Sequence, residues 1–160
     1  GREIKNASIP IEVQAGVADG NTLRLSDRGA IGRRGGYYGD LYIHLRVKEH
    51  PIFERQGDHL LHRFHIPMTQ AALGVDLEYE TLDSTEKISV LPGTQSGHLF
   101  RLKGKGVPHL NGRGRGDFVI EIIVDTPTDL TSEQEDILRD YAEKRNEGVN
   151  SKQKRTWGRR

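Results

Sequence analysis

The 160-residue chain has no cysteine, which excludes disulfide bonds and thiolate metal sites, so the fold must depend on its hydrophobic core. It has no apolar run near the roughly 20 residues that a membrane helix requires, and its first residues lack the apolar segment of a signal peptide. The formal net charge is only +1. We therefore expect a soluble cytoplasmic protein that contacts neither membranes nor nucleic acid.

Glycine is abundant where aromatic residues are scarce. The sequence has 19 glycines but only one tryptophan and four phenylalanines, and glycine is favoured where the backbone turns tightly or adopts a positive φ. Short stretches of alternating apolar and polar residues lie between these glycines, as in half-buried strands. The composition therefore predicts a mainly β fold.

The sequence contains an internal repeat with an offset of 77 residues. When residues 11–47 are set against residues 88–124, twelve of the 37 positions are identical without a gap, whereas chance gives about one match in seventeen. The matched residues are turn glycines and aliphatic residues, which two copies of one supersecondary unit should share. The identical pairs include Gly16 and Gly93, Gly39 and Gly116, Asp40 and Asp117, Ile43 and Ile120.

Each copy reads as strand, turn, strand, long glycine-rich loop and strand. In the first copy these segments are predicted at 9–13, 16–20, 23–25, 29–39 and 41–47. The last strand alternates apolar with polar residues, so one of its faces should lie on a core or beneath a ligand.

The second copy has about thirty preceding residues that the first copy lacks. They are predicted to form a strand at Leu60–Ile66, a short helix at Thr69–Ala72 and a strand at Val75–Tyr79. Their counterparts would fall before residue 1. We therefore expect the first copy to be truncated at its N-terminal edge, with its opening strands cut away, displaced by an insertion, or never present.

A short amphipathic helix is predicted after Pro127. Thr131 is a suitable N-cap with Gln134 three residues later, and the apolar stripe Ile137, Leu138 and Tyr141 must be buried on its own subdomain or on a partner chain. The predicted organisation is then a first β subdomain at 1–48, a linker at 49–57, a second β subdomain at 58–127, the helix at 128–147, and a basic, disordered tail at 148–160.

Several strings in the sequence resemble the C-terminal substrate-binding region of DnaJ-type co-chaperones. They include Gly39-Asp40-Leu41, His50-Pro51-Ile52-Phe53-Glu54-Arg55, Ala71-Ala72-Leu73-Gly74, Pro92-Gly93-Thr94-Gln95-Ser96-Gly97 and Gly104-Lys105-Gly106-Val107-Pro108. The resemblance extends from about residue 1 to 145 and includes the duplication. It implies two tandem β-sandwich-like subdomains of the same fold followed by a dimerisation helix.

The resemblance also implies a function. A member of this family binds non-native client polypeptides and delivers them to a DnaK-type ATPase chaperone through a J-domain, whose His-Pro-Asp signature this chain lacks. The client groove would involve Ile9 and Ile43, and strand parity adds Ile11, Leu23, Leu25 and Leu45 as neighbours on the same face. The alternative for these last four residues is a purely structural place in the core. The helix residues Ile137, Leu138 and Tyr141 would form a homodimer contact.

Other functions fit the sequence less well. The run Gly112-Arg113-Gly114-Arg115-Gly116, with the basic tail, is compatible with a glycine- and arginine-rich nucleic-acid-binding module, but Gly112 and Gly116 have counterparts in the first copy and so belong to a structural loop. His59, His62 and His65 would point to alternating faces of a strand, which disfavours a metal site. No cofactor, metal or catalytic residue is predicted, although a hydrolase built from distant residues stays open.

Overall fold

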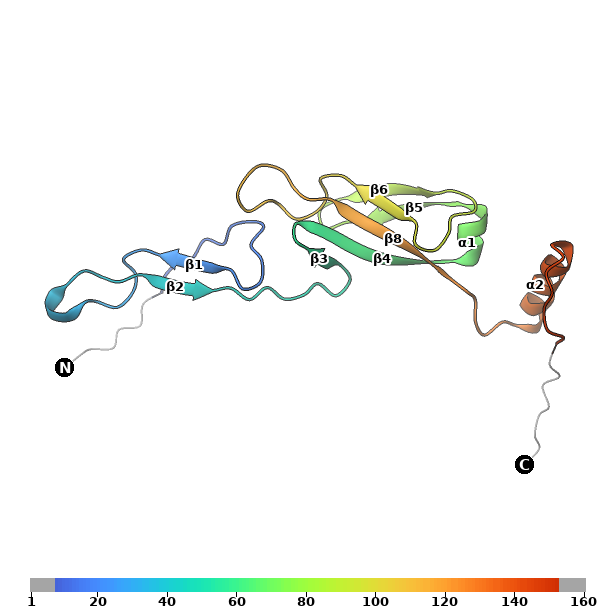
Figure 1. Cartoon of the computed structure of the whole chain (residues 1–160), viewed down its shortest axis with the longest axis horizontal. Helices are drawn as coiled ribbons and strands as arrows, with labels where there is room; N and C mark the ends of the chain where they lie inside the picture. Colours follow the sequence, from blue (N-terminus) through green and yellow to red (C-terminus); the bar gives the residue numbers. More distant parts are fainter. Residues whose placement is uncertain (1–7, 153–160) are drawn as a thin grey trace, which may run out of the picture. The chain divides into compact units, whose positions relative to one another are not determined.

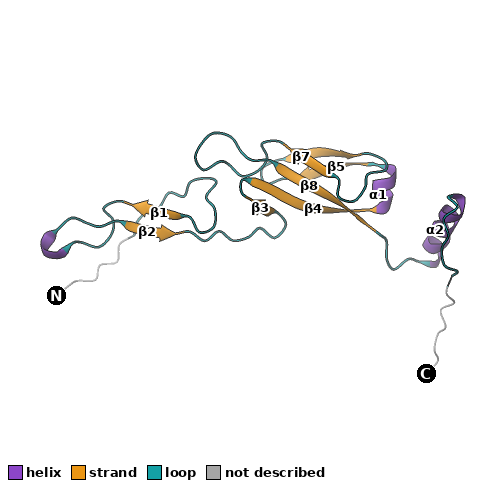
Figure 2. Ribbon diagram, in the orientation of Figure 1, coloured by secondary structure: helices purple, strands orange, loops and turns teal. Residues whose placement is uncertain are grey.

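The computed structural model describes residues 8–152, which are mainly β with a C-terminal helix, as the sequence predicts (Figures 1 and 2). The chain divides into two compact units, one up to Val124 and one from Asp125 onward. Its elements are, in order, β1 (Thr22–Leu25), a 3₁₀ turn (Arg33–Gly35), β2 (Leu41–His44), β3 (Glu54–Gln56), β4 (His59–Pro67), α1 (Met68–Leu73), β5 (Val75–Glu80), β6 (Thr85–Val90), β7 (Leu99–Leu102), β8 (Phe118–Asp125) and α2 (Ser132–Lys144).

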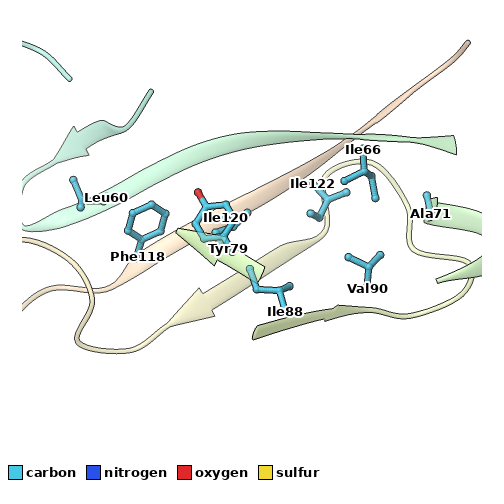
Figure 3. Close-up of a cluster of buried hydrophobic side chains, with 9 residues drawn as sticks. All are labelled: Leu60, Ile66, Ala71, Tyr79, Ile88, Val90, Phe118, Ile120 and Ile122. Carbon is cyan, nitrogen blue, oxygen red and sulfur yellow. The ribbon is translucent and has the colours of Figure 1, made fainter. Parts of the chain in front are cut away.

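The second copy is a two-layer β sandwich. One layer is a sheet with strand order β3-β4-β8-β7, and the other is the antiparallel pair β5-β6. Their facing side chains, together with Ala71 of α1, form one hydrophobic cluster (Figure 3), which consists of Leu60, Ile66, Ala71, Tyr79, Ile88, Val90, Phe118, Ile120 and Ile122. The core of the protein therefore lies between these two sheets.

Strand β8 supplies the centre of this core because its apolar residues have the period of a strand. Phe118, Ile120 and Ile122 alternate along β8 and are almost completely buried. Burial of one such side chain contributes about 1.5–3 kcal/mol before the cost of chain ordering. The residues between them are only half-buried, so β8 has a core face and an outer face.

The repeat predicted from the sequence is reproduced in the strand pairing. Strand β1 pairs with β2 through Leu23 opposite Ile43 and Leu25 opposite Leu41. Strand β7 pairs with β8 through Phe100 opposite Ile120 and Leu102 opposite Phe118, which is the same register shifted by 77 residues. The two copies therefore share one strand arrangement, and the offset in the sequence is an offset in structure.

The same hydrogen bonds recur in the loops of both copies. Arg24 Nε donates to Asp40 Oδ2 at 2.7 Å, and Arg101 donates to Asp117 Oδ2 at 2.9 Å. The second oxygen of each carboxylate accepts a backbone N–H, from Asp27 in the first copy and from Gly104 in the second. The Gly104 bond, followed by the Arg101 bond, lowers the pKa of Asp117. In both copies the aspartate of the repeated Gly-Asp string, at the end of the glycine-rich loop, therefore binds the residues at the start of that loop.

Arg55 connects the first copy to the second. Its guanidinium donates to the carbonyl oxygens of Gly16 and Val17, at 2.8 and 2.7 Å, and its Nε donates to Gly57 O at 2.7 Å. Gly16 has φ +90°, and a Cβ there would lie 2.2 Å from the carbonyl oxygen of Pro108. The turn that contains Gly16 therefore packs directly against the loop of the second copy and has no room for a side chain at this position.

Two strand predictions need correction. The segment 9–13 is not a strand, because its counterpart β6 is held by β5 and the described residues contain no counterpart of β5. The strand predicted at 41–47 ends at His44. In the described residues the first copy is consequently one two-stranded sheet, and only the second copy is a sandwich.

The segment expected to be a linker, 49–57, contains strand β3. Residues Glu54–Gln56 pair in antiparallel register with residues 59–61 of β4, Glu54 opposite Leu61 and Gln56 opposite His59. This strand therefore extends the sheet of the second copy. The predicted helix is present as α2, and Thr131 and Gln134 form the expected capping box. Residues 1–7 and 153–160, which include most of the predicted basic tail, lie outside the described residues.

Two corresponding glycines, Gly116 in the second copy and Gly39 in the first, allow a matched test of the close packing around the second loop. A Cβ at Gly116 would lie 2.0 Å from the carbonyl oxygen of Asp58, whereas a Cβ at the corresponding Gly39 meets only Ala30 O at 3.6 Å. We expect Gly116→Ala to lower the free energy of unfolding by about 1–3 kcal/mol and Gly39→Ala to change it by less than about 0.5 kcal/mol. Urea denaturation followed by circular dichroism measures both, and equal effects would contradict the packing described here.

Candidate functional site: an apolar sheet face in the first copy

The two-stranded sheet of the first copy has one apolar and one polar face. Residues directly opposite in an antiparallel pair share a face, so Leu23, Leu25, Leu41 and Ile43 lie on the same side. The opposite side carries polar contacts, such as the one between Thr22 Oγ1 and His44 Nδ1 at 2.8 Å. We call the four aliphatic residues, together with Leu45, the apolar face.

The apolar face is less covered than its counterpart in the second copy. All five of its residues are only half-buried, whereas the corresponding residues of β8, Phe118, Ile120 and Ile122, are in the core. The segment alongside shows the same contrast, because Ile11 and Val13 are 44% and 53% exposed while Ile88 and Val90 are 5% and 3% exposed. Among residues 8–152, the first copy therefore leaves partly exposed the apolar positions that the second copy buries between its two sheets.

The structure brings together most of the residues predicted for the client groove. Leu23, Leu25 and Ile43 lie in the two strands, and Leu45 follows β2 and continues the ladder by donating its N–H to Asn21 O at 2.8 Å. Ile9 and Ile11 lie instead in the preceding segment, which is not a strand. Ile9 is half-buried and Ile11 is exposed, so neither is a fully buried core residue.

The sequence prediction missed Leu41, which pairs with Leu25 on the apolar face. Its signal was available, because Leu41, Ile43 and Leu45 have the period of two that defines one face of a strand. The prediction also missed Arg55, since nothing in a sequence indicates that a side chain will bind the carbonyl oxygens of Gly16 and Val17.

A small open pocket lies beside β3 and β4 in the second copy. It has a volume of about 260 Å³ and is lined by Pro51, Ile52, Glu54, Leu61, His62 and Arg63. Arg63 lies 3.6 Å from Glu54 and 3.4 Å from Glu121, so the charges at the pocket are paired.

His62 joins this pocket to the aromatic part of the core. Its ring lies edge-on to Phe53 and to Phe64, and its Nδ1 shares a hydrogen bond with the hydroxyl of Tyr79. Burial, and after it the charge of His65, lowers the pKa of His62, and burial raises the pKa of Tyr79. Both shifts favour the uncharged form of each group, and the pair is a packed, hydrogen-bonded link between the pocket and the core.

Helix α2 exposes part of the stripe predicted for dimerisation. Ile137 and Tyr141, four residues apart on one face, are 61% and 54% exposed, whereas Leu138 is half-buried. The residues after the helix return along it, because Arg139 donates to Asn150 O at 2.6 Å and Lys152 Nζ lies 2.8 Å from Asp136. Within its own unit, Ile137 and Tyr141 therefore stay more than half exposed, although the Arg145 guanidinium lies over the Tyr141 ring, 5.6 Å from its centroid.

The other sequence features have structural roles. Arg115, from the arginine- and glycine-rich run, binds Asp83 at 2.5 Å and the carbonyl oxygen of Gly106 at 2.8 Å. His59 accepts the backbone N–H of Asp117. Over residues 8–152 no three metal-ligating side chains come together, and no described helix has the length and apolar character needed to cross a membrane.

The sequence comparisons identify the family to which this fold belongs. The family model for the DnaJ C terminal domain matches residues 2–127, so the chain belongs to the DnaJ C-terminal domain family, as its sequence strings indicate. The matched range includes both copies, the apolar face and the loop strings quoted above.

Individual relatives agree with this assignment. The chain is 47% identical over 135 residues to a protein named chaperone protein DnaJ from Ruminiclostridium cellulolyticum, a match that covers 84% of this chain and 36% of the relative. Proteins of the same name from Haloarcula marismortui and Rhodospirillum centenum are 45% and 44% identical over 90% and 91% of this chain, and over 38% of their own length. The chain thus spans well under half of these relatives.

The pKa of His62 generates a prediction about stability and pH. Because folding lowers this pKa, the unfolded chain binds the proton first as the pH falls below the ordinary value of 6.5, so the folded state loses stability below that pH. We expect the free energy of unfolding to decrease between pH 7.5 and pH 5.5, and we expect His62→Gln, which can still bond to Tyr79, to reduce that decrease. Urea denaturation at several pH values measures this decrease in the free energy of unfolding. An unchanged pH dependence in the His62→Gln variant would show that the decrease does not come from His62.

Proposed function

We propose that this chain binds extended segments of non-native polypeptides on the apolar face of the first copy, as the substrate-binding part of a DnaJ-type co-chaperone. The observation that carries the proposal is the contrast between the copies. Ile43 in β2 is half-buried. Ile120, which occupies the corresponding position in β8 of the second copy, is completely buried. Exposed apolar surface of this kind is typical of a binding site.

Binding would use backbone and side-chain contacts together. In the described residues β1 and β2 pair only with each other, so each strand has a second edge with backbone N–H and C=O groups available for an added strand. A client segment at such an edge binds through main-chain hydrogen bonds that do not depend on its sequence, while its apolar side chains contact the apolar face. This mode suits a protein that must accept many different clients.

The affinity of such a site should be low. Each buried aliphatic side chain of the client contributes about 1.5–3 kcal/mol, and ordering of the extended segment offsets part of this gain. Weak, reversible binding is what transfer to a partner chaperone requires. We propose that the natural protein delivers clients to a DnaK-type ATPase chaperone in the cytoplasm, through a J-domain that this chain does not include, and thereby prevents aggregation.

We propose further that α2 forms a homodimer through Ile137 and Tyr141, with Leu138 at the edge of the contact. The support is the exposure of two large side chains on one face of a well-capped helix. A dimer would bring two weak client sites into one particle and increase the overall affinity for a client with two apolar segments.

Replacement of Ile43 by Asp tests client binding. A carboxylate on the apolar face must lose its hydration when a client covers it, so we expect the affinity for an unfolded peptide to fall at least tenfold. The fold should persist because Ile43 is not in the core. The matched control is Leu99→Asp, which places the same charge on an exposed leucine of β7, and binding should be unchanged. Fluorescence anisotropy with a labelled apolar peptide measures both variants, and undiminished binding by folded Ile43→Asp protein would refute this site.

The double substitution Ile137→Glu and Tyr141→Glu tests dimerisation. Like charges placed on an interface repel, so we expect the variant to be a monomer at concentrations where the unaltered chain is a dimer. Glu143→Gln, on an exposed helix position away from this pair, is the control and should remain dimeric. Sedimentation velocity measures the state, and a monomer at every concentration for the unaltered chain would refute the interface.

A further inference from the structure

The covalent connection between the two copies is short and exposed. Residues 48–52 join them, and each of these residues is exposed and lies outside any strand. Before this segment the N–H of Val47 is bound by Asp19 at 2.9 Å, and after it Phe53 packs against the hydrophobic cluster of the second copy. Among the described residues no strand of the first copy pairs with a strand of the second. The position of one copy on the other therefore depends on side-chain and loop contacts.

Arg55 supplies the first of these contacts and uses all three nitrogens of its guanidinium. Nη1 and Nη2 donate to Val17 O and Gly16 O of the first copy, at 2.7 and 2.8 Å, and Nε donates to Gly57 O at 2.7 Å. The donors of a guanidinium lie in one plane, which a lysine ammonium cannot reproduce. Arg55 itself lies in β3, opposite Leu60 of the core. The turn of the first copy is therefore bound to the sheet of the second.

Asp58 connects Arg55 to the glycine-rich loop of the second copy. One carboxylate oxygen of Asp58 lies 3.6 Å from Arg55 Nη2, and the other lies 2.7 Å from His109 Nδ1. The hydrogen bond with His109, and after it the charges of His109, Arg55 and His59, lower the pKa of Asp58. The backbone carbonyl of Asp58 accepts the N–H of Val107 at 2.9 Å. The side chain and the backbone of Asp58 therefore both hold the same loop.

This loop returns to the turn that Arg55 binds. A Cβ at Gly16 would lie 2.2 Å from Pro108 O, so the backbone of the turn and the backbone of the loop are in direct contact. The contacts thus form a closed ring, which runs from the turn at Gly16 through Arg55 and Asp58 to the loop and back to the turn. Each member has a neighbour on both sides, so the loss of one contact weakens the next.

We propose that this ring is a latch that holds the two copies as one body and can open while both copies stay folded. The latch consists of Gly16, Arg55, Asp58 and His109. None of these residues belongs to the hydrophobic cluster, so opening exposes no core side chain, and the copies then turn about residues 48–52. Arg55 is a positioning residue, because the closed latch gives the apolar face one orientation relative to the second copy. The inference concerns the junction alone and does not depend on client binding.

The distance between two spin labels, measured by pulsed electron paramagnetic resonance, tests the latch. The chain has no cysteine of its own, so labels can be attached at Tyr42→Cys in β2 and Lys87→Cys in β6, which are exposed positions in different copies. The unaltered junction should give one narrow distance. Arg55→Gln should replace it by a broad distribution, and Arg55→Lys should do the same, because the charge is kept and the planar donor set is lost. Arg63→Gln, in the neighbouring strand β4, is the matched control and should keep the narrow distance.

A second label pair separates opening of the latch from unfolding. Labels at Lys87→Cys and Lys103→Cys, both in the second copy, should give the same distance in every variant. His109→Ala should also broaden the distance between the copies, and in combination with Arg55→Gln it should add little, because one break already opens a ring.

Each other outcome overturns the proposal. A narrow distance between the copies in Arg55→Gln or His109→Ala shows that the ring does not hold them, and a narrow distance in Arg55→Lys shows that charge alone suffices. A broad distribution in the unaltered chain or in Arg63→Gln shows that the junction is loose or responds to any lost charge. A changed distance within the second copy shows that Arg55 supports the fold of that copy instead of a separable latch.

Discussion

Burial of the inner side chains of β8 beneath the β5-β6 sheet is the interaction on which the second copy depends. Phe118, Ile120 and Ile122 reach the core only because a second layer lies over them. The same layer brings Asp83 and Glu86 to the cations of the glycine-rich loop. Packing and electrostatics in this copy therefore both follow from one sheet covering another.

In the described residues, the first copy has the same strand pair and loop without that cover. Its strand register and loop hydrogen bonds are those of the second copy, so the local structure does not require the second layer. What changes among the described residues is the burial of the apolar side chains, which is only partial in the first copy. One supersecondary unit thus serves as a core element in one place and as a candidate binding surface in the other.

The connection between the copies depends on backbone contacts. Arg55 binds two carbonyl oxygens of the turn at Gly16 and Val17, and the glycine permits close approach of the loop that contains Pro108. Carbonyl oxygens are present at every residue, so this contact constrains the shape of the turn more than its sequence. The string that contains Arg55 therefore has a structural role in addition to its value as a family signature.

The sequence by itself determined the mainly β fold, the duplication, the capped helix α2 and the family, because these depend on residue identity and periodicity along the chain. Strand parity, which is a local property, paired Leu23 with Leu25 and Ile43 with Leu45, and the register of β1 against β2 placed both pairs on one face. Only the tertiary structure decided that 9–13 is not a strand, that β3 lies within 49–57, and which copy of each repeated residue is buried. Ile43 and Ile120 are identical in the sequence and in register, and among the described residues only Ile120 lies beneath a second sheet.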